Sequence, residues 1–145
     1  MSAASSQPPE GVVIDASAMV DLLARTSDRF LAVRSRLTRT VMHAPAHFDA
    51  EVLSALGRMQ RAGVLTVAQV DTALDELRQA PVTRHGLPPL LAGAWQRRDI
   101  LRLADALYVE LAETAGLVLL TTDQRLARAW PAADAINAPR GDRWL

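Results

Sequence analysis

The stretch GVVIDASAMVDLL, residues 11–23, decides the fold, because a short apolar run ends in an acid and leads at once into a helix-favouring sequence. The β-branched residues at 12–14 predict a buried parallel strand, and the alanines and leucines after Asp15 predict a helix. The stretch LVLLTTDQRLARAW, residues 117–130, has the same order, with Asp123 between an apolar strand and a helix. Two units of this kind predict parallel strands joined through helices.

The apolar periodicity between these two units predicts alternating helices and strands. Helices are predicted at residues 28–37, 46–62, 66–79, 87–96 and 101–115, and strands at 40–45, 81–84 and 134–137. Such alternation predicts an α/β fold, a three-layer α/β/α domain with a small, mostly parallel central sheet. The small, polar and proline-containing residues 1–10 predict a flexible N-terminal tail, so that residues 11–145 form a single domain.

The composition excludes several classes of protein. The 145 residues include 16 acidic and 16 basic side chains, every basic one is arginine, and cysteine and lysine are absent. A disulfide scaffold, a cysteine-ligated zinc site, a thiol nucleophile, a Schiff-base enzyme and a P-loop NTPase are therefore excluded. Zero net charge argues against bulk coating of nucleic acid but permits a local arginine patch. Without a long apolar run or a recognisable signal peptide, the chain is expected to be cytoplasmic and to have no membrane span.

Four acids occupy positions from which they can converge. Asp15 and Asp123 follow the ends of apolar strands, where parallel sheets bind ligands, although a helix N-cap is the alternative for each. Glu51 and Asp105 fall on or beside the apolar faces of their helices. An ionised carboxylate is costly to bury, so each has an arginine partner, lies at a face boundary in water, or contacts a metal ion. The sequence places no basic residue among the four.

Carboxylates a few ångströms apart repel one another, so a cluster of four predicts a bound cation. Oxygen ligands without cysteine favour Mg²⁺ or Mn²⁺, which keep several of their waters and often bind phosphate. Such an ion holds a phosphodiester, stabilises its developing charge and lowers the pKa of an attacking water. The acids therefore predict metal-assisted hydrolysis in which no protein side chain is the nucleophile.

Four motifs resemble those of the PIN-domain ribonucleases and, more narrowly, of the VapC toxins of bacterial toxin–antitoxin modules. They are VIDAS at residues 13–17, FDAEVL at 48–53, ADALYVELAE at 104–113 and LLTTDQRLA at 119–127. The resemblance extends over residues 12–136 in the same order. It implies a PIN-like domain and an Mg²⁺- or Mn²⁺-dependent endoribonuclease, the toxin of a type II module, which cuts a tRNA, rRNA or mRNA.

The resemblance also implies roles for residues and partners. The catalytic metal site is implied to consist of Asp15, Glu51, Asp105 and Asp123. The hydroxyls of Ser17 and Thr122 are implied to support that site, although capping or turn formation also explains both residues. A homodimer is implied, together with a VapB-like antitoxin whose C-terminal segment lies across the groove. An arginine of that antitoxin is expected to enter the acid cluster and displace the metal.

Arginines close to the acids in the sequence are candidates for RNA contact. They are Arg97, Arg98, Arg102 and Arg125. A guanidinium grips phosphate oxygens in a bidentate manner, whereas a solvated helix end or an ion pair with Asp99 is the alternative for the first three. If a metal neutralises the four acids, arginines outnumber acids on the remaining surface. That excess favours an RNA-binding face.

Other interpretations stay open. His43 and His47 are spaced like two metal ligands on one helical face, but Pro45 between them predicts a bend, which disfavours zinc. An acid after the first strand also occurs in haloacid dehalogenase-type phosphatases, which need a second Asp where this chain has Ser17 and usually a lysine. The last alternative is a non-catalytic PIN-like module that binds RNA or protein, and divalent-metal titration separates it from an enzyme.

Overall fold

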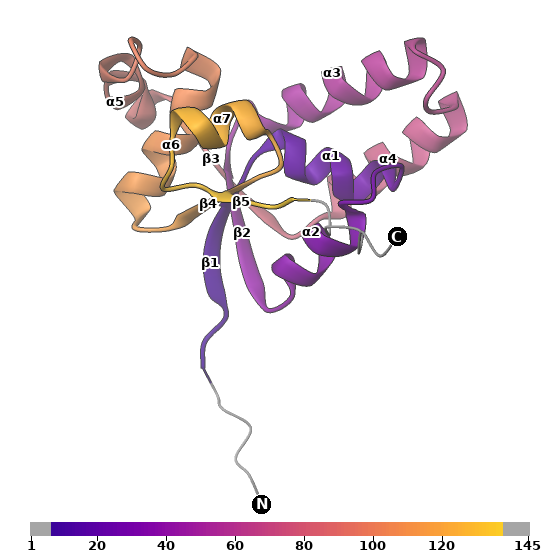
Figure 1. Ribbon diagram of the computed structural model, residues 1–145, viewed down its shortest axis with the longest axis horizontal. Coiled ribbons are helices and arrows are strands. Elements are labelled where there is room, and N and C mark those ends of the chain that lie inside the picture. Colours follow the sequence, from indigo (N-terminus) through magenta and orange to yellow (C-terminus); the bar gives the residue numbers. More distant parts are fainter. Residues whose placement is uncertain (1–6, 138–145) are drawn as a thin grey trace, which may run out of the picture.

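The computed structural model describes residues 7–137 and shows a five-stranded sheet between two layers of helices (Figure 1). The strands are β1 (Glu10–Ile14), β2 (Thr40–Pro45), β3 (Val82–His85), β4 (Val118–Thr121) and β5 (Asp134–Ala135). The helices are α1 (Ala16–Ala24), α2 (Phe30–Leu37), α3 (Phe48–Arg61), α4 (Val67–Gln79), α5 (Leu91–Gln96), α6 (Leu103–Ala115) and α7 (Gln124–Ala129), with a 3-10 turn η1 (Pro88–Leu90) before α5. Every strand pair is parallel, in the order β3-β2-β1-β4-β5, which confirms the predicted three-layer fold.

The boundaries of the elements differ from the sequence prediction by only a few residues. β1 begins at Glu10, inside the stretch predicted as a tail, because Glu10 pairs with Thr40 of β2. The helix predicted from residue 101 begins at Leu103, since residues 97–101 form a turn in which the N–H of Leu101 bonds to the Arg97 carbonyl at 3.0 Å. Residues 1–6 of the predicted tail and 138–145 of the predicted domain lie outside the described residues.

The central strand β1 brings two acids to the same edge of the sheet. Residues 12–14 of β1 pair with residues 118–120 of β4, and the N–H of Asp15 bonds to the Leu120 carbonyl at 3.2 Å. The two strands therefore end side by side. Asp15 and Asp123 are the N-caps of α1 and α7, so the capping alternative holds for both. The caps also hold the two carboxylates at the carboxyl edge of the sheet.

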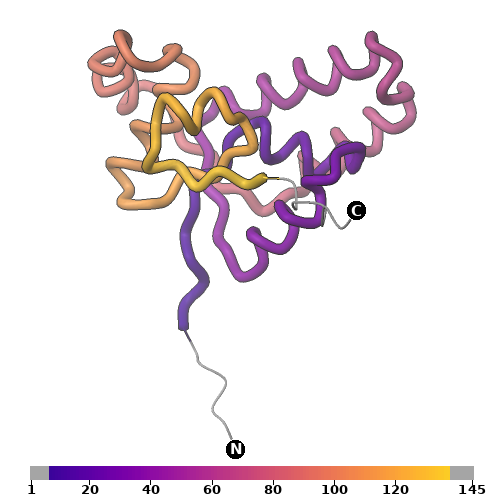
Figure 2. The backbone as a smooth tube through the Cα atoms, viewed as in Figure 1, coloured from indigo at the N-terminus to yellow at the C-terminus, as the bar shows by residue number. Residues whose placement is uncertain are grey.

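Apolar side chains fill both faces of the sheet. Helices α1–α4 lie on one side and α5–α7 on the other (Figure 1). The larger core includes Phe48 and Val52 of α3 and Tyr108 of α6, and a smaller cluster joins Val12 to Val33 of α2. Figure 2 shows α3 and α4 as a pair that extends away from the sheet. Within residues 7–137 no helix has the length and apolarity to cross a membrane.

Candidate active site

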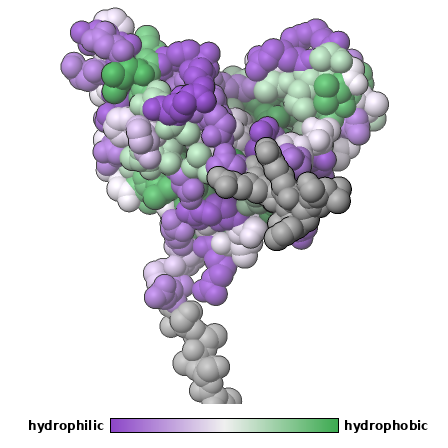
Figure 3. Space-filling model, in the orientation of Figure 1, coloured by the Kyte–Doolittle hydropathy of each residue, from purple (hydrophilic) through white to green (hydrophobic). Residues whose placement is uncertain are grey.

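The four predicted acids line one hollow at the carboxyl edge of the sheet. This four-acid hollow has a volume of about 200 Å³, and its walls come from the first turns of α1, α6 and α7 and from α3. Besides the acids, its lining includes Ser17, Arg58, Arg102 and Tyr108. In Figure 3 the surface is notched between the α3–α4 pair and the region of α5, and the carboxyl end of β1 points toward this notch.

Asp15 is the deepest of the four acids and is held by three donors. Its side chain accepts hydrogen bonds from the Ser17 hydroxyl at 2.7 Å, the backbone N–H of Ala18 at 2.9 Å and the Thr121 hydroxyl at 2.5 Å. Burial raises the pKa of Asp15 from 3.8 to about 6, although the three hydrogen bonds oppose the shift and the charge of Asp123 adds to it. At neutral pH an ionised Asp15 is therefore a buried charge that a cation can offset.

The hydroxyl groups around Asp15 differ from the prediction by one residue. Thr121, the last residue of β4, donates to Asp15 and accepts the backbone N–H of Asp123 at 2.9 Å. Thr122 supplies instead its backbone N–H, which bonds to the Ser17 hydroxyl at 3.1 Å. Side chains alternate along a strand, so only one of the two adjacent threonines faces Asp15. The hydroxyls that contact Asp15 are therefore those of Ser17 and Thr121, and the supporting role of the Thr122 hydroxyl stays a prediction.

Arginines stand among the acids, so the arginine-partner alternative holds for Asp105 and Asp123. The Nη2 atom of Arg125 is 3.1 Å from Oδ2 of Asp105 and 3.0 Å from Oδ2 of Asp123. Arg102 approaches Asp105 from the rim, with Nε 3.4 Å from Oδ2. Arg125 follows Asp123 by two residues on α7, but its reach across to α6 depends on the packing of the two helices. Sequence spacing does not show that packing.

The hollow offers the all-oxygen donor set that a hard divalent cation prefers, and the guanidinium of Arg125 pairs with two of the four acids. Four carboxylates line it, and all their ligand atoms are oxygen. Among residues 7–137, no three acidic, histidine or cysteine side chains stand close enough to hold an ion as they are arranged. Arg125 bridges two of the carboxylates and supplies the positive charge that their proximity demands. The oxygen donors therefore suit a divalent metal, whereas the carboxylates as they are arranged pair with Arg125 instead.

Glu51 enters the hollow from α3 and has a partner that the sequence did not single out. The hydroxyl of Tyr108 donates to Oε1 of Glu51 at 2.6 Å, and Nε2 of His47 lies 3.4 Å from the same oxygen. Tyr108 follows Asp105 by three residues and so shares its helical face. That spacing was the available signal, but it indicated core packing as readily as a polar contact.

Of the four candidate RNA-binding arginines, Arg102 alone lines the hollow. Arg97 forms an ion pair with Glu110 at 3.0 Å and lies over the ring of Trp130, so its partner is not the anticipated Asp99. Arg98 lies over the ring of Trp95, 4.9 Å from its centroid. Arg102 and Arg125 are the two that reach the acids.

The histidines do not form the zinc pair considered from the sequence. Nδ1 of His43 lies 2.9 Å from Nε2 of His85 on the neighbouring strand β3. His47, beyond the end of β2, instead places Nε2 3.0 Å from the carbonyl of Ala104. The bend at Pro45 therefore directs the two rings to different partners.

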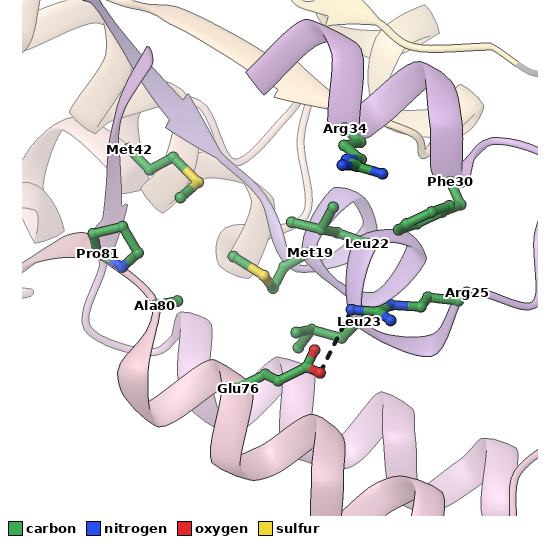
Figure 4. A pocket seen from close by; sticks show the side chains of 10 residues that line it. All are labelled: Met19, Leu22, Leu23, Arg25, Phe30, Arg34, Met42, Glu76, Ala80 and Pro81. Carbon is green, nitrogen blue, oxygen red and sulfur yellow. Dashed lines mark ion pairs between the residues drawn. The ribbon is translucent and has the colours of Figure 1, made fainter. Parts of the chain in front are cut away.

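A second, larger hollow lies away from the acids, between α1, α2 and α4 (Figure 4). This apolar groove has a volume of about 620 Å³. Met19, Leu22 and Met42 are among its apolar lining, and Arg25 pairs with Glu76 at 3.5 Å across its mouth. Its lining has no group of converging acids, so the groove suits binding rather than bond cleavage.

Comparison with known proteins places these features in a family. The model of the PIN domain matches residues 12–130. Ribonuclease VapC3 of Mycobacterium tuberculosis is 82% identical over 94% of this chain and 100% of its own length. Ribonuclease VapC12 of the same species is 37% identical over 81% of this chain and 91% of its own length. The crystal structure of PAE2754 from Pyrobaculum aerophilum aligns with a TM-score of 0.64 at 25% identity, covering 93% of this chain and 91% of that one. A toxin-antitoxin complex from Klebsiella pneumoniae aligns with a TM-score of 0.58 at 15% identity, covering 87% of this chain and 98% of that one.

Proposed function

The chain belongs to the VapC ribonucleases of the PIN-domain family, and from this membership we propose that it is the toxin of a toxin–antitoxin module and hydrolyses RNA phosphodiester bonds. The observation that carries the proposal is the convergence of Asp15, Glu51, Asp105 and Asp123 on one hollow. The proposed substrate is a cytoplasmic tRNA, rRNA or mRNA. Its backbone carries the phosphodiesters that such a site would hydrolyse.

The proposed cofactor is Mg²⁺ or Mn²⁺, bound by the four acids. An all-oxygen donor set and a sequence without cysteine suit a hard divalent ion. Such an ion, when bound, supplies charge at the phosphate oxygens and lowers the pKa of a water. Asp15 enters with its position fixed by three donors, whereas Asp105 and Asp123 exchange the guanidinium of Arg125 for the ion.

Arginines at the rim are proposed to bind and orient the RNA. The side chains of Arg102 and Arg125 are 69% and 44% exposed, and Arg58 of α3 lines the hollow. A guanidinium released from a carboxylate keeps its charge and its planar donors, so it can move to a neighbouring phosphate. Arg98 is proposed to extend this track, whereas Arg97 is committed to Glu110.

The proposed antitoxin occupies the apolar groove of Figure 4 with one of its segments. The groove has an apolar floor, including Leu22 and Phe30, and a rim that carries two arginines against one acid, Arg25 and Arg34 against Glu76. A segment with an apolar face and acidic flanks complements that surface. A Leu22→Arg variant is expected to lose co-purification with the antitoxin and to keep RNA cleavage.

A homodimer is proposed as the state of the free toxin. Exposed apolar side chains at and after α5, namely Leu91, Trp95, Ile100 and Leu103, offer the apolar area that such an interface needs. Light scattering coupled to size-exclusion chromatography measures the mass directly. A Trp95→Glu variant is expected to shift that mass to a monomer.

The cleavage assay uses purified, antitoxin-free protein, total bacterial RNA, and either Mn²⁺ or EDTA. Cleavage is expected with Mn²⁺, is expected to disappear in EDTA, and should fall by about 100-fold or more in Asp15→Asn and Asp105→Asn. Equal cleavage by all three proteins contradicts the proposal. A wild type that neither binds Mn²⁺ nor cleaves RNA supports the non-catalytic binding module instead.

A further inference from the structure

Tyr108 lies where the elements that carry the acids meet. It is 1% exposed and belongs to α6, one turn after Asp105. Its hydroxyl donates to Oε1 of Glu51 on α3 at 2.6 Å. One buried phenol thus connects two of the helices that form the four-acid hollow.

We propose that Tyr108 is a positioning residue that holds the Glu51 carboxylate at the four-acid hollow, an inference that rests on the proposed function of that site. Asp15 has three donors of its own, whereas the longer side chain of Glu51 is 35% exposed and has more torsions to restrain. The donation engages Oε1 and leaves Oε2 for the hollow.

His47 fixes the ring from which that hydroxyl extends. Its imidazole packs against the Tyr108 ring with centroids 4.8 Å apart, and its Nε2 lies 3.0 Å from the carbonyl of Ala104. That carbonyl assigns the ring proton to Nε2. Because His47 stands one turn before Glu51 on α3, the ring contact and the hydroxyl contact hold the same two helices together.

Removal of the hydroxyl should free Glu51 without emptying the core. Tyr108→Phe keeps the ring and its packing, so the fold is expected to survive. Loss of a hydrogen bond to a metal ligand typically lowers metal affinity or activity by about 10- to 100-fold. Mn²⁺ affinity is therefore expected to fall by about tenfold in Tyr108→Phe.

The test is a double-mutant cycle measured by calorimetric titration of Mn²⁺ into the full, antitoxin-free chain. The cycle comprises wild type, Tyr108→Phe, Glu51→Gln and the double variant, with thermal unfolding recorded for each. The matched control is Thr114→Val, which removes another α6 hydroxyl, one that bonds only to the backbone carbonyls of Glu110 and Leu111. If Tyr108 acts through Glu51, the double variant binds Mn²⁺ as weakly as Glu51→Gln alone.

Each outcome decides a different point. Unchanged Mn²⁺ affinity in Tyr108→Phe, or losses that add in the double variant, overturn the positioning role while the proposed function stands. A loss that follows the unfolding temperature, and that Thr114→Val reproduces, assigns Tyr108 to the core alone and also overturns it. A wild type without Mn²⁺ binding overturns the metal-dependent function and this inference together.

Discussion

The two halves of the acid site are held in different ways. Asp15 is 4% exposed and receives three hydrogen bonds from groups that the strand ends and the start of α1 fix in place. Asp105 and Asp123 are instead bridged by Arg125, a side chain that is 44% exposed and stands at the rim. The position of Asp15 is therefore fixed by the fold itself. Asp105 and Asp123 are held by the guanidinium of Arg125, which another cation can replace.

This difference indicates how a cluster of four acids folds without a cation. Burial raises the pKa of Asp15, so its charge is easier to neutralise by protonation, whereas the two outer acids pair with the guanidinium of Arg125. In both cases the protein without metal is less stable than it would be with a divalent ion bound to these carboxylates.

The largest effect is expected for Asp15→Asn, which should abolish cleavage and stabilise the protein. The amide keeps acceptors for Ala18 and Ser17 and removes a buried charge. A pKa near 6 against 3.8 in the unfolded chain corresponds to about 3 kcal/mol at pH 7.5. Urea unfolding in EDTA should therefore show Asp15→Asn to be more stable by about 2–3 kcal/mol.

The same pair of proteins tests the pH dependence. Because the folded-state pKa of Asp15 is raised, its contribution to stability is fully present below about pH 4 and is lost as the pH rises through about 6. The stability difference between Asp15→Asn and wild type should vanish near pH 4 and grow to its full size by pH 7.5. A constant difference, or one of the opposite sign, shows that Asp15 is not a destabilising buried charge.

The next largest effect on stability is expected for the ion pair of Arg97 and Glu110, which is less exposed than Arg125. Arg97 and Glu110 pair at 3.0 Å with little exposure, and a Cβ on Gly93 would lie 2.1 Å from the Glu110 carboxylate. Glu110→Ala leaves Arg97 unpaired and should lower the free energy of unfolding by about 2–3 kcal/mol. Gly93→Ala should also destabilise, because it displaces Glu110. The exposed Glu113→Ala on the same helix is the control and should change stability by less than about 0.5 kcal/mol.

The smallest effect on stability is expected for Arg125→Gln. The partly exposed bridge contributes only about 1 kcal/mol, so unfolding in EDTA should shift by that amount. Removal of the competing guanidinium should tighten Mn²⁺ binding by about tenfold in calorimetry without RNA, and the KM for RNA should rise. Arg128→Gln, an exposed arginine one turn along α7, should change neither quantity. Weaker Mn²⁺ binding in Arg125→Gln would mean that the arginine supports the ion rather than competing with it.

The sequence predicted the fold and the convergence of the four acids on one hollow, because both follow from local patterns. Apolar runs that end in Asp15 and Asp123 mark strands and caps wherever those strands lie. Helical spacing places Glu51 and Asp105 on inward margins. The position of Arg125 between two helices, the choice of Thr121 over Thr122 and the pairing of Arg97 with Glu110 all depend on how side chains face one another across elements. Spacing along the chain carries no information about those contacts.

The most direct test of the account is to map new RNA 5′ ends in cells after brief induction of the wild type or of Asp15→Asn, with equal protein levels confirmed. The account predicts discrete 5′ ends in the wild type that Asp15→Asn does not produce, even though that variant is the more stable protein. The same ends in both strains, or none above the uninduced background in either, would contradict the claim that the acid site cuts RNA.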